Sequence, residues 1–387
     1  MTATQASAAV ASSTAEVQEQ VRDAVSRRRA VRIAGGGSWL DANRPVRAEL
    51  TIATSRLAGI IEYEPGDLTL TARAGTTLDT IARAAEAHGQ WLALDPFGDS
   101  TAATIGATIA TASYGPLAHH FGTPRDMTLG VEFVAGTGDI VRGGGRVVKN
   151  VAGYDLTRLV TGSWGSLGVL TEVTVRLRAL PAVQATLVLE VGASPEQVEH
   201  VRRAVHALPF VPLALEWIDG TLGRRLELSA PGAAILVRLG GNEDAVRAQR
   251  TALEALGMAH ELPPTVWNRL RVAEPARSVT FRLSRLPSEF AATWSEASRL
   301  VARWPGASCH GDPGRGVVRC VLPPSVGEEN VRPIIDVPSS GTRIFEQLPP
   351  SLWPLVTPAV REPLELRIKA AFDPHGVLNP GILGELQ

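Results

Sequence analysis

The sequence has little of several features that mark special classes of protein. Only two of its 387 residues are cysteine, which excludes a disulfide framework and leads us to expect a cytoplasmic protein. The formal net charge of −1 gives no reason to expect nucleic acid or an anionic membrane as a partner. No apolar run reaches the roughly 18 residues of a membrane span, and the first twenty residues contain no lysine or arginine, so no secretory signal is expected.

Lysine is almost absent, because only Lys149 and Lys369 among the 38 basic residues are lysines. A compact ammonium and a flat guanidinium are not equivalent, so a lysine retained in an arginine-rich chain is a candidate for a chemical or structural role. Chance retention is the open alternative. The hydrophobic content of 44% and charged content of 20% are typical of a globular protein with an ample core, and the length favours two domains.

Glycine, in contrast, is gathered in loops that follow apolar strands. The first loop is Gly35-Gly36-Gly37-Ser38, directly after a predicted strand at 31–34. Without a Cβ, successive N–H groups can converge on an anion. The loop is neither a P-loop nor a Rossmann fingerprint, because it lacks the Gly-Lys-Ser/Thr and G-x-G-x-x-G spacings. A tight structural turn is the alternative interpretation.

Further segments between residues 95 and 171 extend this series. They are Asp95-Pro96-Phe97, Thr104-Ile105-Gly106, Gly122-Thr123-Pro124-Arg125-Asp126, the run from Lys149 to Leu159, and Gly165-Ser166-Leu167-Gly168-Val169-Leu170-Thr171. The nearly uncharged stretch 95–115 could run buried beside a flat aromatic ligand, or it could be ordinary core. One loop would mean little, but the ordered series predicts a surface for a large dinucleotide.

The hydrophobic pattern predicts a mixed α+β chain. Residues 1–13 are small and polar and are expected to be disordered. Strands are predicted at 31–34, 49–54, 67–72, 127–135, 139–142 and 167–177, and helices at 14–29 and 78–88. After Pro181 the chain reads as strand 187–191, helix 195–207, strands 213–218 and 234–239, and helix 243–256, the order of a small sheet with helices on one face. Irregular connections are expected at 323–363 and a last helix at 364–372, and no internal repeat is evident.

Few side chains offer acid, base or metal-ligand chemistry. His119 and His120 are adjacent, and no third ligand lies nearby in the sequence. The cluster Cys309-His310-Gly311-Asp312 has no spaced partner either, so no metal site is predicted. A loop beside a cofactor cleft is the other interpretation of the two histidines. Tyr154 lies in the Lys149 motif, where a buried hydroxyl would need a partner.

Taken together, these motifs resemble the FAD-binding domain of the vanillyl-alcohol oxidase (PCMH-type) superfamily. The triple glycine resembles its pyrophosphate loop, the segments at 95–126 its second FAD segment, and 165–171 its third. Asp373-Pro374 with Asn379-Pro380-Gly381 resembles its closing signature. Within the superfamily, Gly143-Gly144, the run 149–159 and Gly162-Ser163-Trp164-Gly165 resemble the FAD-binding subunits of bacterial glycolate oxidases, also called glycolate dehydrogenases. The resemblance covers about 30–180 and 364–384.

The resemblance implies a two-subdomain PCMH-type FAD-binding domain at 1–182, a smaller α+β cap at 183–360, and a C-terminal return at 361–387. It implies that the triple glycine holds the pyrophosphate, that 104–115 line the ribityl chain and ring, and that Asn379 lies near the flavin. The implied cofactor-binding residues are Gly35, Gly36, Gly37, Ser38, Pro96, Thr104, Ile105, Gly106, Thr111, Ala112, Ser113, Tyr114, Gly115, Gly122, Arg125, Asp126, Lys149, Gly168, Val169 and Asn379.

The sequence also departs from the superfamily's patterns. Ser38 stands where covalent-flavin relatives carry a histidine, so FAD is expected to bind non-covalently. The His-x-Gly-Asp-Gly-Asn-x-His motif of metal-dependent 2-hydroxyacid dehydrogenases is replaced by the residues from Cys309 to Gly316. Residues 151–368 contain no lysine that could grip a carboxylate. The chain therefore looks equipped for FAD but poorly equipped to oxidise a hydroxy acid alone.

The implied function is that of an FAD-dependent oxidoreductase subunit that supports oxidation of glycolate to glyoxylate and electron transfer. Its expected partners are a related FAD-containing catalytic subunit and an iron–sulfur subunit. The complex is expected in the cytoplasm, where its partners could attach it to the inner face of the cell membrane. Two alternatives stay open. The chain could be a self-sufficient oxidase or dehydrogenase of a small 2-hydroxy acid with His119, His120 or Tyr154 as acid–base group, or a scaffold whose FAD is structural.

Overall fold

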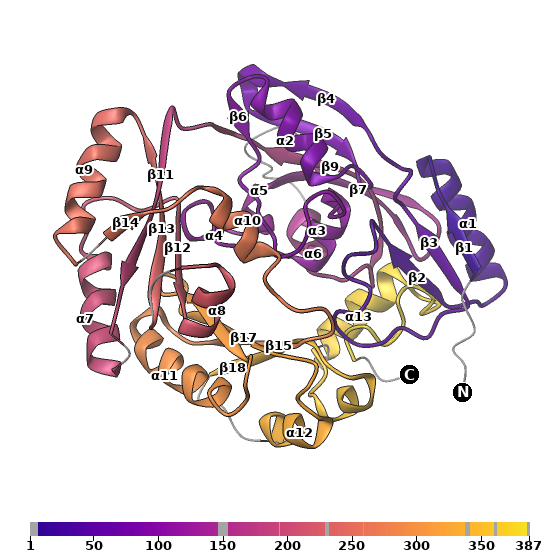
Figure 1. Ribbon diagram of the computed structural model, residues 1–387. Helices are drawn as coiled ribbons and strands as arrows, with labels where there is room; N and C mark the ends of the chain where they lie inside the picture. The colour runs from indigo at the N-terminus through magenta and orange to yellow at the C-terminus, as the bar shows by residue number, and fades with distance from the viewer. Residues whose placement is uncertain are drawn as a thin grey trace. The chain divides into compact units, whose positions relative to one another are not determined.

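The computed structural model describes residues 7–145, 154–192, 194–228, 232–257, 259–336, 341–359 and 362–384 (Figure 1). By its packing the chain divides into two compact units. Unit 1 comprises Met1–Tyr114, Gly122–Leu180 and Thr357–Gln387, and unit 2 comprises Gly115–Phe121 and Pro181–Val356. The domain boundaries expected at 182/183 and 360/361 stay a prediction, and the assignment of residues 115–121 to unit 2 was not anticipated.

The described residues of unit 1 form short helices and three small sheets. Its elements are β1 (Ser7–Val10), α1 (Thr14–Ser26), β2 (Val31–Ala34), β3 (Leu50–Ala53), β4 (Ile60–Glu64), the 3-10 turn η1 (Pro65–Asp67), β5 (Thr69–Arg73), α2 (Leu78–Glu86), β6 (Gln90–Trp91), α3 (Ile105–Thr111), α5 (Pro124–Met127), β7 (Thr128–Ala135), β8 (Ile140–Gly144), α6 (Leu156–Val160), β9 (Gly168–Arg176), β10 (Arg178–Ala179) and α13 (Pro363–Phe372). The sheets have the orders β1-β3-β2, which is parallel, β4-β5-β9-β7-β8, which is antiparallel, and β10-β6.

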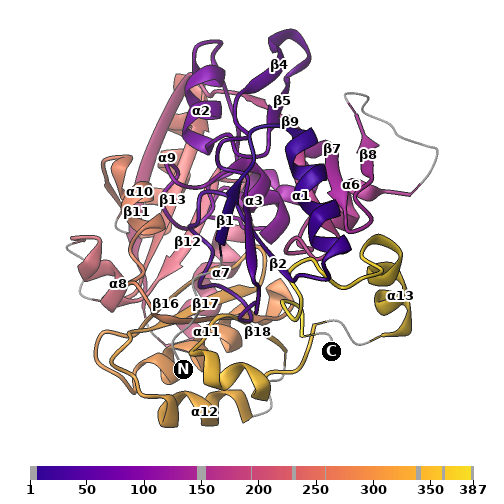
Figure 2. The ribbon, with the colours of Figure 1, turned by 90° about the vertical axis from the view of Figure 1, so that its right-hand side faces the viewer.

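Helix α1 joins the two larger sheets of unit 1 through one apolar face. The Ser13 hydroxyl accepts a hydrogen bond from the Glu16 N–H at 3.2 Å and so caps the helix. Val17 and Val21 are fully buried in one cluster with Ile52 of β3 and Val134 of β7. Figure 2 shows α1 lying beside β7. The four-residue spacing of Val17 and Val21 places both on this face.

The expectation of disorder at residues 1–13 is wrong for the described part of that segment. Residues 7–10 form β1, which pairs in parallel with β3, and Ala11 is fully buried in the same core as α1. Strand β4 was also missed, because it carries no strict alternation of buried and exposed residues.

Unit 2 contains one large antiparallel sheet. Its elements are α4 (Ala118–Phe121), β11 (Val183–Glu190), α7 (Pro195–His206), β12 (Ala214–Ile218), α8 (Gly220–Arg225), β13 (Ala234–Gly241), α9 (Glu243–Glu254), β14 (Ala259–Glu261), α10 (Thr265–Arg271), β15 (Val279–Ser284), η2 (Pro287–Glu289), α11 (Phe290–Val301), β16 (Ser308–Asp312), β17 (Val317–Leu322), α12 (Glu328–Asp336), β18 (Thr342–Gln347) and η3 (Pro350–Leu355). The strand order is β14-β11-β13-β12-β16-β17-β15-β18.

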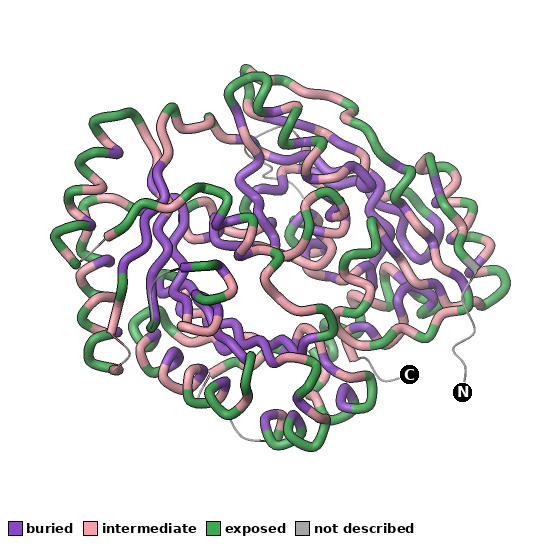
Figure 3. The backbone as a smooth tube through the Cα atoms, viewed as in Figure 1, coloured by how far each residue is buried: buried purple, intermediate pink, exposed green. Residues whose placement is uncertain are grey.

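The two halves of this sheet repeat the same order of helices and strands, which the sequence did not reveal. Apart from α8 after β12 and η2 after β15, the order β11-α7-β12-β13-α9-β14 recurs as β15-α11-β16-β17-α12-β18, and the halves join where β12 pairs with β16. Side chains of these strands form one core with side chains of α7, α9, α11 and α12. In Figure 3 much of the backbone of this sheet is coloured as buried. The expectation that 323–363 is irregular is wrong, because this stretch contains α12 and the edge strand β18.

Candidate cofactor site

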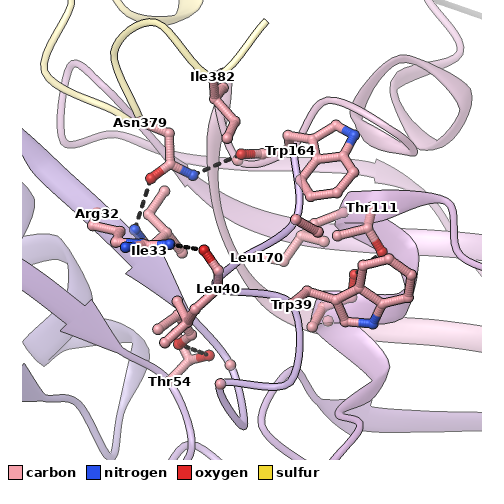
Figure 4. A pocket seen from close by; sticks show the side chains of 18 of the residues that line it. Arg32, Ile33, Trp39, Leu40, Thr54, Thr111, Trp164, Leu170, Asn379 and Ile382 are labelled. Atoms are coloured by element: carbon pink, nitrogen blue, oxygen red, sulfur yellow. Dashed lines mark hydrogen bonds between the residues drawn. The ribbon is translucent and has the colours of Figure 1, made fainter. Parts of the chain in front are cut away.

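A pocket in unit 1 lies where four segments far apart in the sequence meet (Figure 4). They are the loop after β2, helix α3, the turn before β9, and the C-terminal segment around Asn379. The lining residues are Arg32, Ile33, Ala34, Gly35, Gly37, Ser38, Trp39, Leu40, Ala42, Val46, Thr54, Ala74, Gly106, Ala107, Ala110, Thr111, Trp164, Gly165, Gly168, Leu170, Asn379 and Ile382.

The triple-glycine loop lies against the segment that precedes α3. A Cβ added at Gly36 would lie 1.9 Å from the Ala102 carbonyl oxygen, and one at Gly35 would lie 2.5 Å from the Thr104 hydroxyl. Gly37 has a φ of +85°, a conformation that favours glycine. Within the described chain, the N–H groups of Gly36, Gly37 and Ser38 donate no hydrogen bond to another residue. Three successive amide donors are therefore available to an anion.

A positive charge accompanies these donors. Arg32 lines the same pocket, and its guanidinium donates a hydrogen bond to the Leu40 carbonyl, as Figure 4 shows. Burial lowers the pKa of Arg32, and the nearby Asp41 carboxylate opposes that shift. An arginine side chain stays charged in proteins, so it suits a phosphate ligand beside unpaired amides. This donor set fits the diphosphate of FAD.

Asn379 fastens the C-terminal segment to both sides of the pocket. Its Oδ1 accepts a hydrogen bond from the Ile33 N–H at 2.8 Å, and its Nδ2 donates one to the Trp164 carbonyl at 2.6 Å (Figure 4). Asn379 has a φ of +42°, which asparagine tolerates better than most residues. The two bonds join segments 346 and 215 residues away in sequence. A role of Asn379 in holding the pocket together follows, and its closeness to flavin stays a prediction.

Two tryptophans and neighbouring aliphatic residues supply the apolar surface of the pocket. Trp39 and Trp164 meet edge to face, with ring centroids 6.2 Å apart. Leu170 and Ile382 also line the pocket. Sequence reasoning missed Arg32 and Trp39 as site residues, although Trp39 directly follows the predicted glycine loop. Trp164 lies in the motif Gly162-Ser163-Trp164-Gly165. Aromatic and apolar surface next to anion donors suits a nucleotide.

The structure brings together part of the predicted set of cofactor residues. The predicted residues that line the pocket are Gly35, Gly37, Ser38, Gly106, Thr111, Gly168 and Asn379. Gly36 and Thr104 belong to the packing behind the loop, and Ile105 and Val169 are fully buried. Lys149 lies outside the described residues.

The remaining predicted cofactor residues are not among those that line this pocket, and their role stays a prediction. They are Pro96, Ala112, Ser113, Tyr114, Gly115, Gly122, Arg125 and Asp126. Asp126 has a local role, since it accepts hydrogen bonds from the Thr123 N–H at 2.8 Å and the Thr123 hydroxyl at 2.9 Å. Gly122 touches the same carboxylate, because a Cβ there would lie 2.6 Å from Oδ2. Gly115 belongs to unit 2.

The three candidate acid–base residues lie in different surroundings. His119 and His120 are on α4 in unit 2, where His119 Nδ1 lies 2.8 Å from Asp312 Oδ1 and His120 Nδ1 lies 3.2 Å from the Val211 carbonyl. Tyr154, in unit 1, is 91% exposed. The acid–base role of each of the three residues stays a prediction.

Metal, thiol and membrane features are also defined by the described residues. Among them, no group of three histidine, cysteine, aspartate or glutamate side chains is placed to hold a metal ion. Cys309 and Cys320 are fully buried opposite each other on β16 and β17, and burial raises the pKa of each thiol, which makes both unreactive. No helix in the described parts of the chain is long and apolar enough to span a bilayer.

Comparison with known proteins identifies the class of the chain. Residues 6–144 match the family model for an FAD binding domain. The chain is 32% identical over 366 residues to glycolate oxidase subunit GlcE of Escherichia coli (strain K12), covering 94% of this chain and 95% of that protein. It is 28% identical over 384 residues to glycolate oxidase subunit GlcD of Bacillus subtilis (strain 168), covering 87% and 80%.

The fold has a solved counterpart as well. The crystal structure of p-cresol methylhydroxylase with substrate bound superposes with a TM-score of 0.77 at 16% identity, covering 97% of this chain and 88% of that one. The family model and the relatives thus define an FAD-dependent oxidoreductase, and its fold is the PCMH-type α+β fold. The chain belongs to the family of glycolate oxidase subunit GlcE. The resemblance, the fold class and the cofactor inferred from the sequence are confirmed.

Denaturation of the protein is expected to release the flavin as unmodified FAD. Among the described residues, the pocket lining includes no histidine or cysteine that could be a covalent attachment point, and Ser38 occupies the loop. Heat or acid should therefore release all of the yellow colour into the supernatant as FAD rather than FMN, which chromatography of the supernatant would identify. Flavin that stays with the precipitated polypeptide would contradict non-covalent binding, and FMN in the supernatant would contradict the diphosphate site.

Proposed function

We propose that this chain is the FAD-binding subunit of a glycolate oxidase (glycolate dehydrogenase) complex, which supports oxidation of glycolate to glyoxylate and electron transfer. The observation that carries the proposal is the extent of the match to GlcE, which includes 94% of this chain and 95% of that protein. The match therefore includes both the FAD-binding unit and the unit with the large sheet. A match to the FAD domain alone would not favour one substrate over another.

The chemistry of the reaction favours a division of work between subunits. Oxidising a 2-hydroxy acid requires a cation for the carboxylate and a base or metal for the hydroxyl proton. The described part of unit 2 holds no three-residue metal group, and unit 1 supplies an FAD site. We assign the hydride step to a related FAD-containing catalytic subunit and electron acceptance to an iron–sulfur subunit. This chain then contributes its FAD, the environment that sets its potential, and docking.

The docking surface and location belong to the same proposal. We place part of the docking surface on the described residues of 323–363, which include α12 and the edge strand β18. An edge strand presents unpaired N–H and C=O groups that another chain can pair with. We place the complex in the cytoplasm, with any association with the inner face of the cell membrane made through its partners.

One observation favours the alternative of a self-sufficient enzyme. The contact between His119 and Asp312 has the geometry by which a carboxylate orients a histidine base. Turnover of glycolate by the isolated chain, abolished in His119→Ala, would promote this alternative. Flavin in the assembled complex that is never reduced by substrate would instead promote the scaffold.

Co-expression tests the proposed function directly. The chain is expected to co-purify with a GlcD-type FAD subunit and an iron–sulfur protein encoded beside it, and this assembly should reduce a dye with glycolate. The isolated chain should show a rate at least about a hundredfold lower, because removal of catalytic base and orientation costs factors of this order. The control omits each protein in turn. Equal activity after omission of this chain would refute its role in the complex.

A further inference from the structure

The seam where the two halves of the unit 2 sheet meet carries buried polar side chains. Trp217 pairs with Gly311 and Ile218 with His310 across β12 and β16, and the same register sets Glu216 opposite Asp312. Trp217 and Cys309 point into the core, so Glu216, His310 and Asp312 lie on the opposite face of the sheet. All three are buried. Buried titratable groups outside the core need a function or a partner.

His119 is held on this face in a fixed orientation. Helix α4 packs against β12, and His119 Nδ1 lies 2.8 Å from Asp312 Oδ1. The same carboxylate oxygen accepts the Gly314 N–H at 2.8 Å, which fixes the carboxylate in turn. A Cβ at Gly314 would lie 2.7 Å from His119 Cε1, so the imidazole occupies the space that a larger residue would fill.

The second nitrogen of the ring is available to a ligand. Nδ1 of His119 contacts Asp312, and no residue within the described ranges forms a hydrogen bond with Nε2 of His119. Arg315 comes near this part of α4, since Arg315 Nη1 donates a hydrogen bond at 3.5 Å to the carbonyl of Ala118, the residue before His119. An oriented imidazole and a guanidinium thus lie within one short stretch of the fold.

A second histidine–carboxylate pair lies on the same face of the sheet. His310 Nδ1 lies 2.6 Å from Glu216 Oε1. Burial raises the pKa of the Glu216 carboxyl, which His310 opposes and the charge of Asp312 reinforces. Glu216 consequently resists carrying a negative charge next to Asp312. An incoming anion therefore meets less repulsion than the count of carboxylates suggests.

We propose that His119, oriented by Asp312, forms with Arg315 a binding site for the anion of a small 2-hydroxy or 2-keto acid. A guanidinium binds a carboxylate with paired hydrogen bonds, and an imidazole nitrogen reaches the neighbouring hydroxyl or keto oxygen. This inference rests on the proposed function for its choice of acid. The site binds substrate or product on this subunit and does not require that the subunit carry out the oxidation.

The test uses the full-length chain loaded with FAD, and the probe is glycolate or oxalate. Calorimetry should detect binding, and NMR of isotope-labelled histidine should show one of the eight histidine side chains shifting as glycolate is added. His119→Gln should remove that signal. His119→Gln and Arg315→Gln should each weaken binding at least about tenfold, as expected for loss of a charged hydrogen bond. Asp312→Asn should weaken it as well, because the ring loses its orientation.

Matched controls keep this test decisive. His200→Gln and Arg303→Gln change exposed residues of the same types in the same unit and should leave affinity unchanged. Should His119→Gln fail to fold, the NMR titration of the unaltered protein and Arg315→Gln still decide. No binding of either probe, or equal loss in the controls, would overturn the site and leave the His119–Asp312 contact as a structural tie. An assembled complex that oxidises glycolate while this chain binds no acid would refute this inference alone, whereas a complex without glycolate turnover would refute the proposed function.

Discussion

The Gly36→Asp variant is expected to purify almost free of FAD. Its Cβ would lie 1.9 Å from the Ala102 carbonyl oxygen, a backbone atom, so the loop must move. Its carboxylate would also place a negative charge among the unpaired N–H groups of Gly36, Gly37 and Ser38 that we assign to the diphosphate. Flavin released per polypeptide, measured by absorbance after denaturation, should fall by about tenfold or more, as expected for at least one lost charged interaction.

Two further comparisons separate charge from packing. Gly36→Ala introduces the same Cβ without the charge and should cost roughly 1–3 kcal/mol of stability through overpacking. Ser38→Asp adds the charge at a residue that already has a Cβ and lines the pocket, and Ser38→Asn is its neutral match. FAD should be lost in Ser38→Asp and largely kept in Ser38→Asn. Full FAD content in both Gly36→Asp and Ser38→Asp would show that this loop is only a turn.

The Asn379→Leu variant is expected to unfold at a clearly lower temperature than the unaltered protein. The Ile33 N–H and the Trp164 carbonyl would lose the partners that now lie at 2.8 and 2.6 Å. Leaving a buried polar group unpaired costs about 1–3 kcal/mol, so the loss for the two groups should total roughly 2–6 kcal/mol. At about 2–4 °C per kcal/mol for domains of this size, Tm by calorimetry should fall by roughly 4–24 °C, and FAD should bind more weakly.

Asn43→Leu is the matched control for this prediction. Asn43 also has a positive φ, +61°, but its Oδ1 accepts only the adjacent Arg44 N–H at 2.9 Å. The same backbone strain is therefore introduced without separating distant segments. If both variants lower Tm equally, the effect of Asn379 is local strain and the proposed tie across the pocket is wrong.

Elements with clear patterning were predictable from the sequence. Helix α1 has valines at four-residue spacing and a serine cap, and polar and apolar residues alternate along β5. The second half of the unit 2 sheet was not predictable in this way. Strand β16 reads Ser-Cys-His-Gly-Asp, which offers neither β-branched residues nor an apolar alternation. Its burial depends on α11 and on its neighbours β12 and β17, which only the folded chain brings together.

The cofactor pocket shows the same division. Its glycines could be predicted because close backbone approach leaves glycine few substitutes, as at Gly35 and Gly36 beside residues 102–104. Arg32 gave no signal, since its place in the pocket depends on the loop folding back so that Leu40 accepts its hydrogen bond. Likewise, His119 lies in a glycine-rich cofactor motif in sequence but contacts Asp312, 193 residues away. Sequence distance conceals such partners.

The most direct test of the central claim is dye reduction by the assembled complex when only this subunit's FAD site is altered. The complex carrying Ser38→Asp should assemble normally by size, lack one FAD relative to the complex carrying Ser38→Asn, and lose most of its glycolate-dependent activity. The Ser38→Asn complex should stay active. Full activity of a correctly assembled Ser38→Asp complex that lacks this FAD would contradict the account and show that the flavin of this subunit takes no part in the oxidation of glycolate.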